Sequence, residues 1–291
     1  MKTIATTIAS IALICLLNVS AKGESIMTDY SSSASRPVSA PITTESAGQQ
    51  GKLASQSVVR VVCKSTNMGG TGFLHKSGQI ISAAHVVTGC PQTDIVIVTP
   101  SQKMLAVKSF KADAQLDLAL ITPSENIAGN ALPISQKAEI AVGTPVVTWG
   151  FPAGYNGLIP LLAVGYLAGI DRLPTQSGLT PPRWVINAAF NGGNSGGPVL
   201  SQEDGSVIGV VSSKLAPIPL YIESALAALA NQKSGFTYTR TLASGKTETI
   251  SEGQVVAEVL TYLRSQTQLV LGHAVTSQDL VAFLKKEGIT P

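Results

Sequence analysis

The chain has 291 residues; 44% of them are apolar, 13% are charged, and the formal net charge is +3. A chain of this length can bury a sizeable core, as one large domain or as two barrel-like halves. The high apolar content excludes an intrinsically disordered protein. The weak charge, with no basic cluster, gives no support for a nucleic-acid partner.

The first 21 residues have the pattern of a secretory signal peptide. Lys2 supplies the positive charge, Ile4 to Leu17 form the apolar region, and Val19-Ser20-Ala21 is a small-residue cleavage site. The apolar region is too short for a membrane span, so we expect a secreted or periplasmic protein with residues 1–21 removed and no stable membrane anchor. Residues 22–52 are rich in Ser, Thr, Ala and Pro without a hydrophobic period, which predicts a flexible leader.

From residue 53 the chain changes to short β-branched or apolar runs separated by turn residues, a spacing typical of an all-β barrel or sandwich. Predicted strands of a first half are Ser57–Cys63, Gly72–His75, Gln79–Ala83, Asp94–Thr99, Met104–Phe110 and Leu116–Ile121. Predicted strands of a second half are Pro145–Trp149, Leu161–Leu167, Arg183–Ala189, Pro198–Leu200, Val207–Ser213 and Phe236–Arg240. The halves, residues 53–125 and 141–240, predict two packed barrels with a site at their interface.

The remaining residues, 241–291, predict a short helical extension. Ser251-Glu252-Gly253-Gln254 has capping-box spacing before an apolar stripe, and a shorter stripe over Leu280–Leu284 ends before Gly288. We interpret these stripes, and an earlier one over Ile222–Leu229, as packing faces.

Removal of the signal peptide leaves two cysteines, Cys63 and Cys90. In an exported and oxidising setting the pattern favours a disulfide between them, with two buried thiols as the alternative.

A glycine-rich loop around Ser195 is the strongest functional signal. Glycines at 192, 193, 196 and 197 surround the serine, and apolar runs flank the loop on both sides. Such a loop buries nothing of its own, so we interpret it as placing the serine hydroxyl beside convergent backbone N–H groups. Two such donors beside a nucleophile form an oxyanion hole, which stabilises charge on an attacked carbonyl oxygen.

A nucleophilic serine needs a base, and the base needs an orienting carboxylate. His85 follows the apolar run Ile80–Ala84, where small residues leave room for an imidazole. Asp117 lies inside the apolar run Leu116–Ile121, where an unpaired carboxylate would be costly, so we expect it to pair with His85. The other histidines, His75 and His273, are predicted to lie on the surface.

These residues resemble those of the chymotrypsin-fold serine proteases, and most closely the bacterial HtrA (Deg) type. The resemblance runs from Gly70-Thr71-Gly72-Phe73 through His85 and Asp117 to the specific string around Ser195, and covers most of residues 55–240. It implies two six-stranded β-barrels with His85 as general base, Asp117 as its orienter and Ser195 as nucleophile. It also implies an oxyanion hole from the N–H groups of Gly193 and Ser195.

The same resemblance implies the substrate-binding residues, namely Ala189, Phe190, Ser212, Ser213 and Lys214. Ser212 would lie near Asp117, and Ser213 and Lys214 would pair their backbone with the substrate. Ala189 offers no acid to receive Lys or Arg, and Phe190 partly fills the pocket. The expected specificity is therefore for small or medium aliphatic residues. A Lys214 ammonium turned into the pocket would instead favour acidic residues, as in glutamyl endopeptidases, although the assigned wall lacks the histidine typical of those enzymes.

The chain departs from the family pattern in several places. Asn187 stands where many HtrA proteins have Asp, and Gly192 where they have Pro. Asn194 replaces the Asp that trypsin-type zymogens use to bind a new N-terminus, so that route of activation is not expected. The 51 residues after Arg240 leave no room for an HtrA-style PDZ domain.

Two other interpretations compete with a serine endopeptidase. Gly193–Gly197 also fits the G-x-S-x-G pattern of α/β-hydrolases, but Pro198 opposes the helix that this fold needs. The one downstream histidine, His273, precedes Asp279, which is the wrong order for that fold. A catalytically silent protease-fold binding protein usually lacks a triad residue, and none is missing here. We expect polypeptide substrates and no metal or cofactor.

Overall fold

The computed structural model describes residues 48–291, except for residues 67, 128, 173, 176–177, 180, 215–219, 234, 242–245 and 267–269. The predicted signal peptide and residues 22–47 of the predicted leader lie outside the described residues. The last residues of that leader, 48–52, belong to a helix, α1 (Gly48–Ser57), so the predicted boundary at 52 is wrong. Of the helices described, each is too short or too polar to cross a bilayer.

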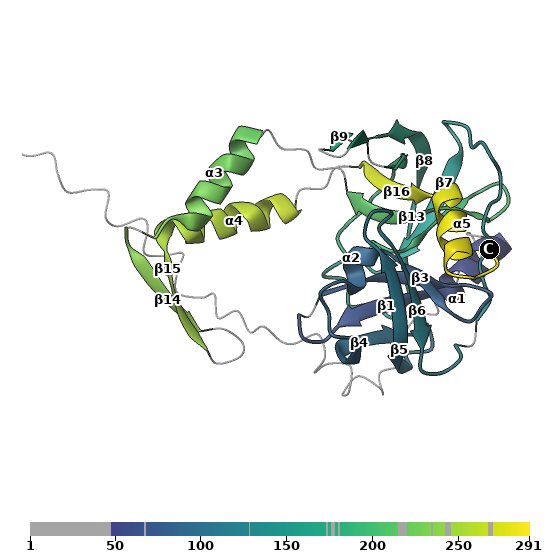
Figure 1. The fold of residues 1–291 in the computed structure, drawn as a ribbon, viewed down its shortest axis with the longest axis horizontal. Helices are drawn as coiled ribbons and strands as arrows, with labels where there is room; N and C mark the ends of the chain where they lie inside the picture. Colours follow the sequence, from purple (N-terminus) through teal and green to yellow (C-terminus); the bar gives the residue numbers. More distant parts are fainter. Residues whose placement is uncertain are drawn as a thin grey trace, which may run out of the picture.

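Two closed six-stranded antiparallel barrels form the body of the molecule, as the sequence predicts (Figure 1). The first has the strand order β1-β2-β3-β6-β5-β4 and the second β11-β16-β13-β12-β7-β8. The first barrel's strands are β1 (Val58–Cys63), β2 (Met68–Leu74), β3 (Ile80–Ser82), β4 (Ile95–Val98), β5 (Met104–Asp113) and β6 (Leu118–Pro123). Those of the second are β7 (Pro145–Gly150), β8 (Leu161–Asp171), β11 (Arg183–Asn187), β12 (Pro198–Ser201), β13 (Val207–Lys214) and β16 (Gly272–Thr276).

Three apolar clusters hold this architecture together. One fills the first barrel around Ile80 and Ile121, and one fills the second around Ile186 and Val199. The third joins the barrels and includes Phe283 of the last helix, α5 (Ser277–Lys286). Burial of these side chains supplies the main driving force for packing the two barrels. Closure gives each barrel strand a neighbour on both sides over part of its length, and the end of β13 extends past β12.

The sequence boundary at residue 240 is wrong for the second barrel. The predicted strand Phe236–Arg240 corresponds to β14 (Thr237–Thr241), which pairs with β15 (Thr247–Ser251) in a separate two-stranded sheet. The sixth strand of the barrel is instead β16, which pairs with β11 and β13. The chain therefore returns to the barrel after residue 271, and β16 and α5 are integral to the fold.

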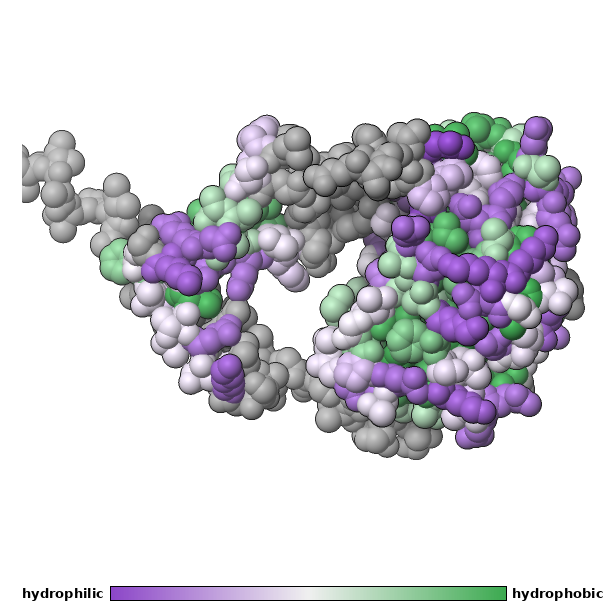
Figure 2. All heavy atoms as spheres, viewed as in Figure 1, coloured by the Kyte–Doolittle hydropathy of each residue, from purple (hydrophilic) through white to green (hydrophobic). Residues whose placement is uncertain are grey.

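The segment between β13 and β16 forms a small unit of its own. It contains α3 (Leu220–Asn231), the β14–β15 hairpin and α4 (Glu252–Gln266), and Figure 1 shows it to the side of the barrels. The predicted capping box is present: Ser251 N donates to Gln254 Oε1 at 2.8 Å, and Gln254 N donates to Ser251 Oγ at 3.3 Å. The helices pack on each other, but Val259 and Leu263 of α4 stay about half exposed, and hydrophobic and hydrophilic residues mix on the visible face (Figure 2).

Short elements complete the structure. They are α2 (Ala84–Val87), a 3-10 turn η2 (Gln92–Asp94), β9 (Pro174–Thr175) and β10 (Gly178–Leu179).

Both histidines that were predicted to lie on the surface are buried. His75 is 3% exposed and its Nδ1 lies 2.9 Å from Ser77 Oγ. His273 is 6% exposed because it lies in β16, and its Nε2 is 3.2 Å from Asp171 Oδ2. The prediction failed because each buried ring has a polar partner. That of His75 is Ser77, two residues away, and that of His273 is Asp171, which is distant in the sequence.

Candidate active site

The structure brings His85 and Asp117 together, as the sequence predicts. His85 lies in the short helix α2, directly after β3, and Asp117 lies one residue before β6, which pairs with β3. The imidazole Nδ1 lies 2.9 Å and 3.0 Å from the two carboxylate oxygens of Asp117, and the backbone N of His85 donates to Oδ1 at 3.1 Å. The carboxylate therefore fixes both the ring and the backbone of the histidine.

Ser212 of β13 connects this pair to Ser195. Its hydroxyl donates to Asp117 Oδ2 at 2.5 Å, and its carbonyl accepts from Ser195 Oγ at 3.1 Å. Among the described residues, the Ser195 hydroxyl is thus bonded to the Ser212 carbonyl and not to the imidazole. Without substrate, catalytic hydrogen bonds are often long or poorly aligned, and they tighten only in the complex with substrate.

The environment of Asp117 keeps it ionised. Burial by itself would raise the pKa of this carboxyl, but hydrogen bonds from His85 and Ser212 outweigh the burial and hold the pKa below its usual value. Its side chain is 19% exposed, whereas that of His85 is 50% exposed and open to solvent. This arrangement suits His85 as a general base: the ionised Asp117 orients the imidazole, and the ring remains accessible from solvent.

The loop around Ser195 requires two of its glycines in a left-handed conformation. Gly196 has φ +86°, and a Cβ there would lie 2.1 Å from Thr71 O, so only glycine fits. Gly193 has φ +90°, and the preceding carbonyl, Gly192 O, accepts from Ala153 N at 2.6 Å. Because a trans peptide directs its C=O and N–H to opposite sides, the Gly193 N–H points away from Ala153.

Two residues that were not among the predicted site residues hold this loop. The Thr71 hydroxyl donates to Gly193 O at 2.7 Å and accepts from Phe151 N at 3.0 Å, so it ties the first barrel to the second. The buried Asn194 side chain donates to Ala189 O at 3.2 Å and closes the loop on itself. Thr71 lies within the Gly-Thr-Gly string of the first half, and that string was the available signal.

The predicted substrate-binding residues lie on two sides of this loop. Phe190 is 1% exposed within the apolar cluster of the second barrel, and its ring lies against Gly272. Ser212 is buried and Ser213 exposed on β13, while the side chain of Lys214 lies outside the described part of the structure. Among the described strands, Ser213 and Lys214 pair with β16 on one edge, while the pairing of β13 with β12 on the other edge ends at Val210.

A cavity of about 280 Å³ lies next to Gly192 and Gly193 of the nucleophile loop. It is lined by Gly70, Phe151 and Tyr155, with Met68 at its exposed rim. Arg60 is stacked 4.7 Å above the centre of the Phe151 ring in its wall. The cavity borders the nucleophile loop at Gly192 and Gly193, and Ser212 is not among the residues that line it.

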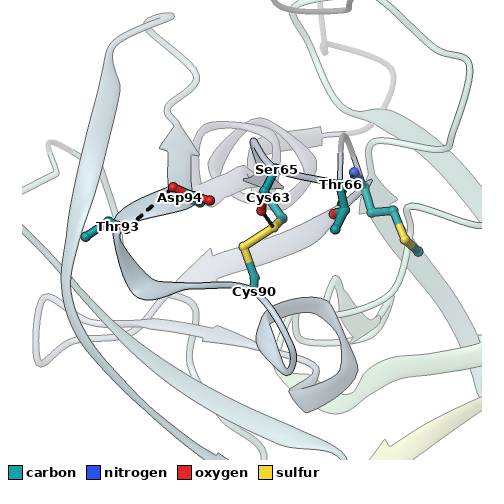
Figure 3. Close-up of a disulfide and its surroundings, with 7 residues drawn as sticks. Cys63, Ser65, Thr66, Cys90, Thr93 and Asp94 are labelled. Carbon is teal, nitrogen blue, oxygen red and sulfur yellow. Dashed lines mark hydrogen bonds between the residues drawn. A yellow bond between two sulfur atoms is a disulfide. The ribbon is translucent and has the colours of Figure 1, made fainter. Parts of the chain in front are cut away.

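The predicted disulfide between Cys63 and Cys90 is present, with the two Cα atoms 6.0 Å apart (Figure 3). Cys63 ends β1, and Cys90 follows α2 by three residues. The bond therefore ties the helix that carries His85 to the wall of the first barrel.

Comparison with known proteins agrees with this geometry. Residues 70–210 match the trypsin-like peptidase domain. The chain is 28% identical over 155 residues to "Serine protease Do-like HtrA" of Bacillus subtilis, covering 50% of this chain and 34% of that protein. It is 30% identical over 148 residues to "Putative serine protease HhoA" of Synechocystis, covering 48% and 36%. The chain thus spans about a third of the length of these curated relatives.

Solved structures share the fold. The active form of the Rv3671c protease from M. tuberculosis superposes with a TM-score of 0.56 at 18% identity, covering 88% of this chain and 91% of that one. The two closed barrels and this likeness show the chymotrypsin fold. The match of residues 70–210 to the trypsin-like peptidase domain makes this part of the chain similar to the HtrA-like serine proteases.

Proposed function

We propose that this protein is a secreted or periplasmic serine endopeptidase whose catalytic residues are His85, Asp117 and Ser195. The observation that carries the proposal is the chain of contacts from His85 through Asp117 and Ser212 to Ser195. These four residues come from both barrels and meet at their interface. Names of relatives such as "Probable periplasmic serine endoprotease DegP-like" support the compartment, as does the predicted signal peptide.

Each residue has a defined chemical part in this proposal. Ser195 Oγ leaves the Ser212 carbonyl, transfers its proton to His85 Nε2 and attacks the peptide carbonyl to form a tetrahedral oxyanion. The N–H groups of Gly193 and Ser195 stabilise that oxyanion. His85 then protonates the leaving amine, which gives an acyl-enzyme, and a water molecule activated by the same imidazole releases the acid. Asp117 stays ionised and stabilises the imidazolium.

The free edge of β13 supports the binding of an extended polypeptide. Ser213 and Lys214 use one edge for β16, and the opposite edge continues past the end of β12 toward the nucleophile loop. A substrate strand adding to this edge would place its scissile bond near Ser195.

We further propose that the side chain before the scissile bond is small or medium aliphatic. Ala189 provides no acid for Lys or Arg, and the Phe190 ring fills space next to Gly272. His273, on the neighbouring strand, could have favoured an acidic side chain as in glutamyl endopeptidases. Its Nε2 already lies 3.2 Å from Asp171, so that ring is engaged with a carboxylate of the protein itself.

A fluorophosphonate probe tests the proposal directly, because it labels only a serine activated by its neighbours. We expect labelling of the wild-type chain at Ser195, identified by peptide mapping, and none in Ser195→Ala. Cleavage of an unfolded protein should be lost in the same variant. A wild-type chain that is folded but neither labelled nor active would instead indicate a protease-fold binding protein.

A further inference from the structure

The backbone of Asp117 is held in an unfavourable conformation. Its φ is +57°, in the left-handed region that non-glycine residues rarely adopt. Such a conformation costs free energy and persists only where the surroundings impose it. Contacts to the loop between β5 and β6 must therefore impose the left-handed conformation of Asp117.

Arg183 reaches this loop from the second barrel. It is the first residue of β11, and its Nη2 donates to Leu116 O at 2.9 Å and to Gln115 O at 3.2 Å. These are the carbonyls of the two residues directly before Asp117. The guanidinium is 13% exposed, so the two charge-assisted bonds are shielded from water.

The first turn of α5 provides the counter-charge. Asp279 Oδ2 lies 3.9 Å from Arg183 Nη1, and within the described residues neither of these two buried atoms has a hydrogen-bond partner. Thr276 Oγ1 accepts from Asp279 N at 3.1 Å and so caps the helix at this point. Burial lowers the pKa of Arg183 and raises the pKa of Asp279, and their opposite charges counteract both effects.

The last turn of α5 holds the other end of the loop. Lys286 Nζ donates to Asp113 Oδ2 at 2.9 Å. Asp113 Oδ1 in turn accepts from the backbone N atoms of Gln115 and Leu116, both at 3.1 Å. The N–H groups of residues 115 and 116 are thus bonded to Asp113, and their carbonyls to Arg183.

We propose that Arg183 is a positioning residue for Asp117, and that α5 supports it through Asp279 and Lys286. The inference rests on the proposed catalytic role of Asp117. Arg183 fixes the peptides that lead into the left-handed residue, and so sets the direction of the carboxylate toward His85. Gln278, Lys285 and Lys286 are exposed on the outer face of α5, whereas its inner face carries Leu280, Phe283 and Leu284 into the core between the barrels. The packed helix therefore supports the contacts of Arg183, Asp279, Lys286 and Asp113 around this loop, which we call the clamp.

The test compares Arg183→Met with Arg183→Lys. We expect Arg183→Met to lower kcat by about 10²-fold, the scale for a catalytic group displaced by about 1 Å, with KM little changed. Arg183→Lys should recover part of kcat, because its ammonium restores the charge and one donor. Lys103→Met is the matched control: Lys103 pairs with Glu125 on the surface, far from the clamp, and the variant should keep wild-type kcat.

A double-variant cycle separates positioning from general stability. If Arg183 acts through Asp117, Arg183→Met should have little further effect on kcat when Asp117 is already replaced by Asn. An undiminished effect in the Asp117→Asn background overturns the proposal. The low-field proton resonance of His85 Nδ1 gives a readout that needs no turnover: it should broaden or move in Arg183→Met and stay in place in Lys103→Met.

If Arg183→Met does not fold, Lys286→Met provides the same readouts with a milder change, and an unaltered resonance and kcat there count against the proposal. Failure of the proposed function appears differently. The wild-type chain would then not react with the fluorophosphonate probe, while the His85 resonance would still report whether Arg183 positions Asp117.

Discussion

Ser212 donates its hydroxyl to Asp117 Oδ2 at 2.5 Å, and the same oxygen lies 3.0 Å from His85 Nδ1. The carboxylate is therefore held between a residue of the first barrel and one of the second, so its position depends on how the two barrels are packed.

Ser212→Ala removes a hydrogen bond to a charged group, of the kind worth about 1.5–3 kcal/mol. We expect kcat to fall by about tenfold, equivalent to about 1.4 kcal/mol, with a smaller change in KM. Kinetics with a fluorogenic peptide measure this. Ser206→Ala, on the turn before β13, is a matched control and should leave kcat unchanged.

Replacement of the proposed nucleophile or base should have a far larger effect. Ser195→Ala and His85→Ala should each reduce turnover by about 10⁴- to 10⁶-fold, because residues of a triad act as a unit. Both side chains are partly exposed, so thermal unfolding should remain close to that of the wild type. The double variant should be no slower than the worse of the two single variants. Nearly intact activity in Ser195→Ala would rule out the triad assignment.

The disulfide should contribute mainly to stability. Cys63 and Cys90 are separated by 27 residues in sequence, and closing a loop of this size stabilises the folded state by about 3–4 kcal/mol in the chain-entropy description. The double variant Cys63→Ser/Cys90→Ser should lose about this amount in chemical denaturation. Thiol titration of denatured, unreduced wild-type protein provides the control: two free thiols would show that the bond does not form.

The pH dependence of stability should report on Asp117. Its pKa is lower in the folded protein than in the unfolded chain, so the unfolded state binds more protons in acid and stability falls as the pH drops. This contribution is fully present above the ordinary pKa of an aspartate, about 3.9, and is lost as the pH falls through the lower folded value. Asp117→Asn should therefore flatten the acid side of the stability curve. An identical curve for the variant would mean that the hydrogen bonds from His85 and Ser212 do not stabilise the ionised form.

The sequence predicted those parts of the site that depend on local pattern. Asp117 stood out because an acid inside an apolar run must have a partner. The glycines around Ser195 stood out because a loop that buries nothing of its own must serve to place the serine. The return of β16 to the second barrel was missed, because a strand of five residues after an inserted unit gives no local sign of its partners. Arg183 was missed for the same reason: its hydrogen-bond acceptors lie 67 and 68 residues away along the chain. Such contacts are set by how the barrels and α5 pack together, which no short window of sequence contains.

The contact between Phe190 and Gly272 gives the sharpest test of specificity. A Cβ on residue 272 would lie 2.1 Å from Phe190 Cδ2, so Gly272→Ala must push the ring from its place. If the ring floors the substrate pocket, moving it toward the substrate should reduce cleavage after leucine more than cleavage after alanine. One methylene changes discrimination by about 1–3 kcal/mol, so a shift of about tenfold or more in the kcat/KM ratio is expected.

Phe190→Ala should act in the opposite direction, by opening space below the substrate and shifting preference toward larger side chains. Because the ring is fully buried, the variant should also lose about 3–5 kcal/mol of stability, and cleavage should be measured well below its melting temperature. Cleavage-site sequencing on an unfolded protein gives the result for both variants in one experiment. Opposite shifts in Gly272→Ala and Phe190→Ala would assign the ring to the pocket. Unchanged preferences in both would make Phe190 part of the barrel core alone, and cuts chiefly after Lys, Arg or Glu in the wild type would refute the aliphatic pocket altogether.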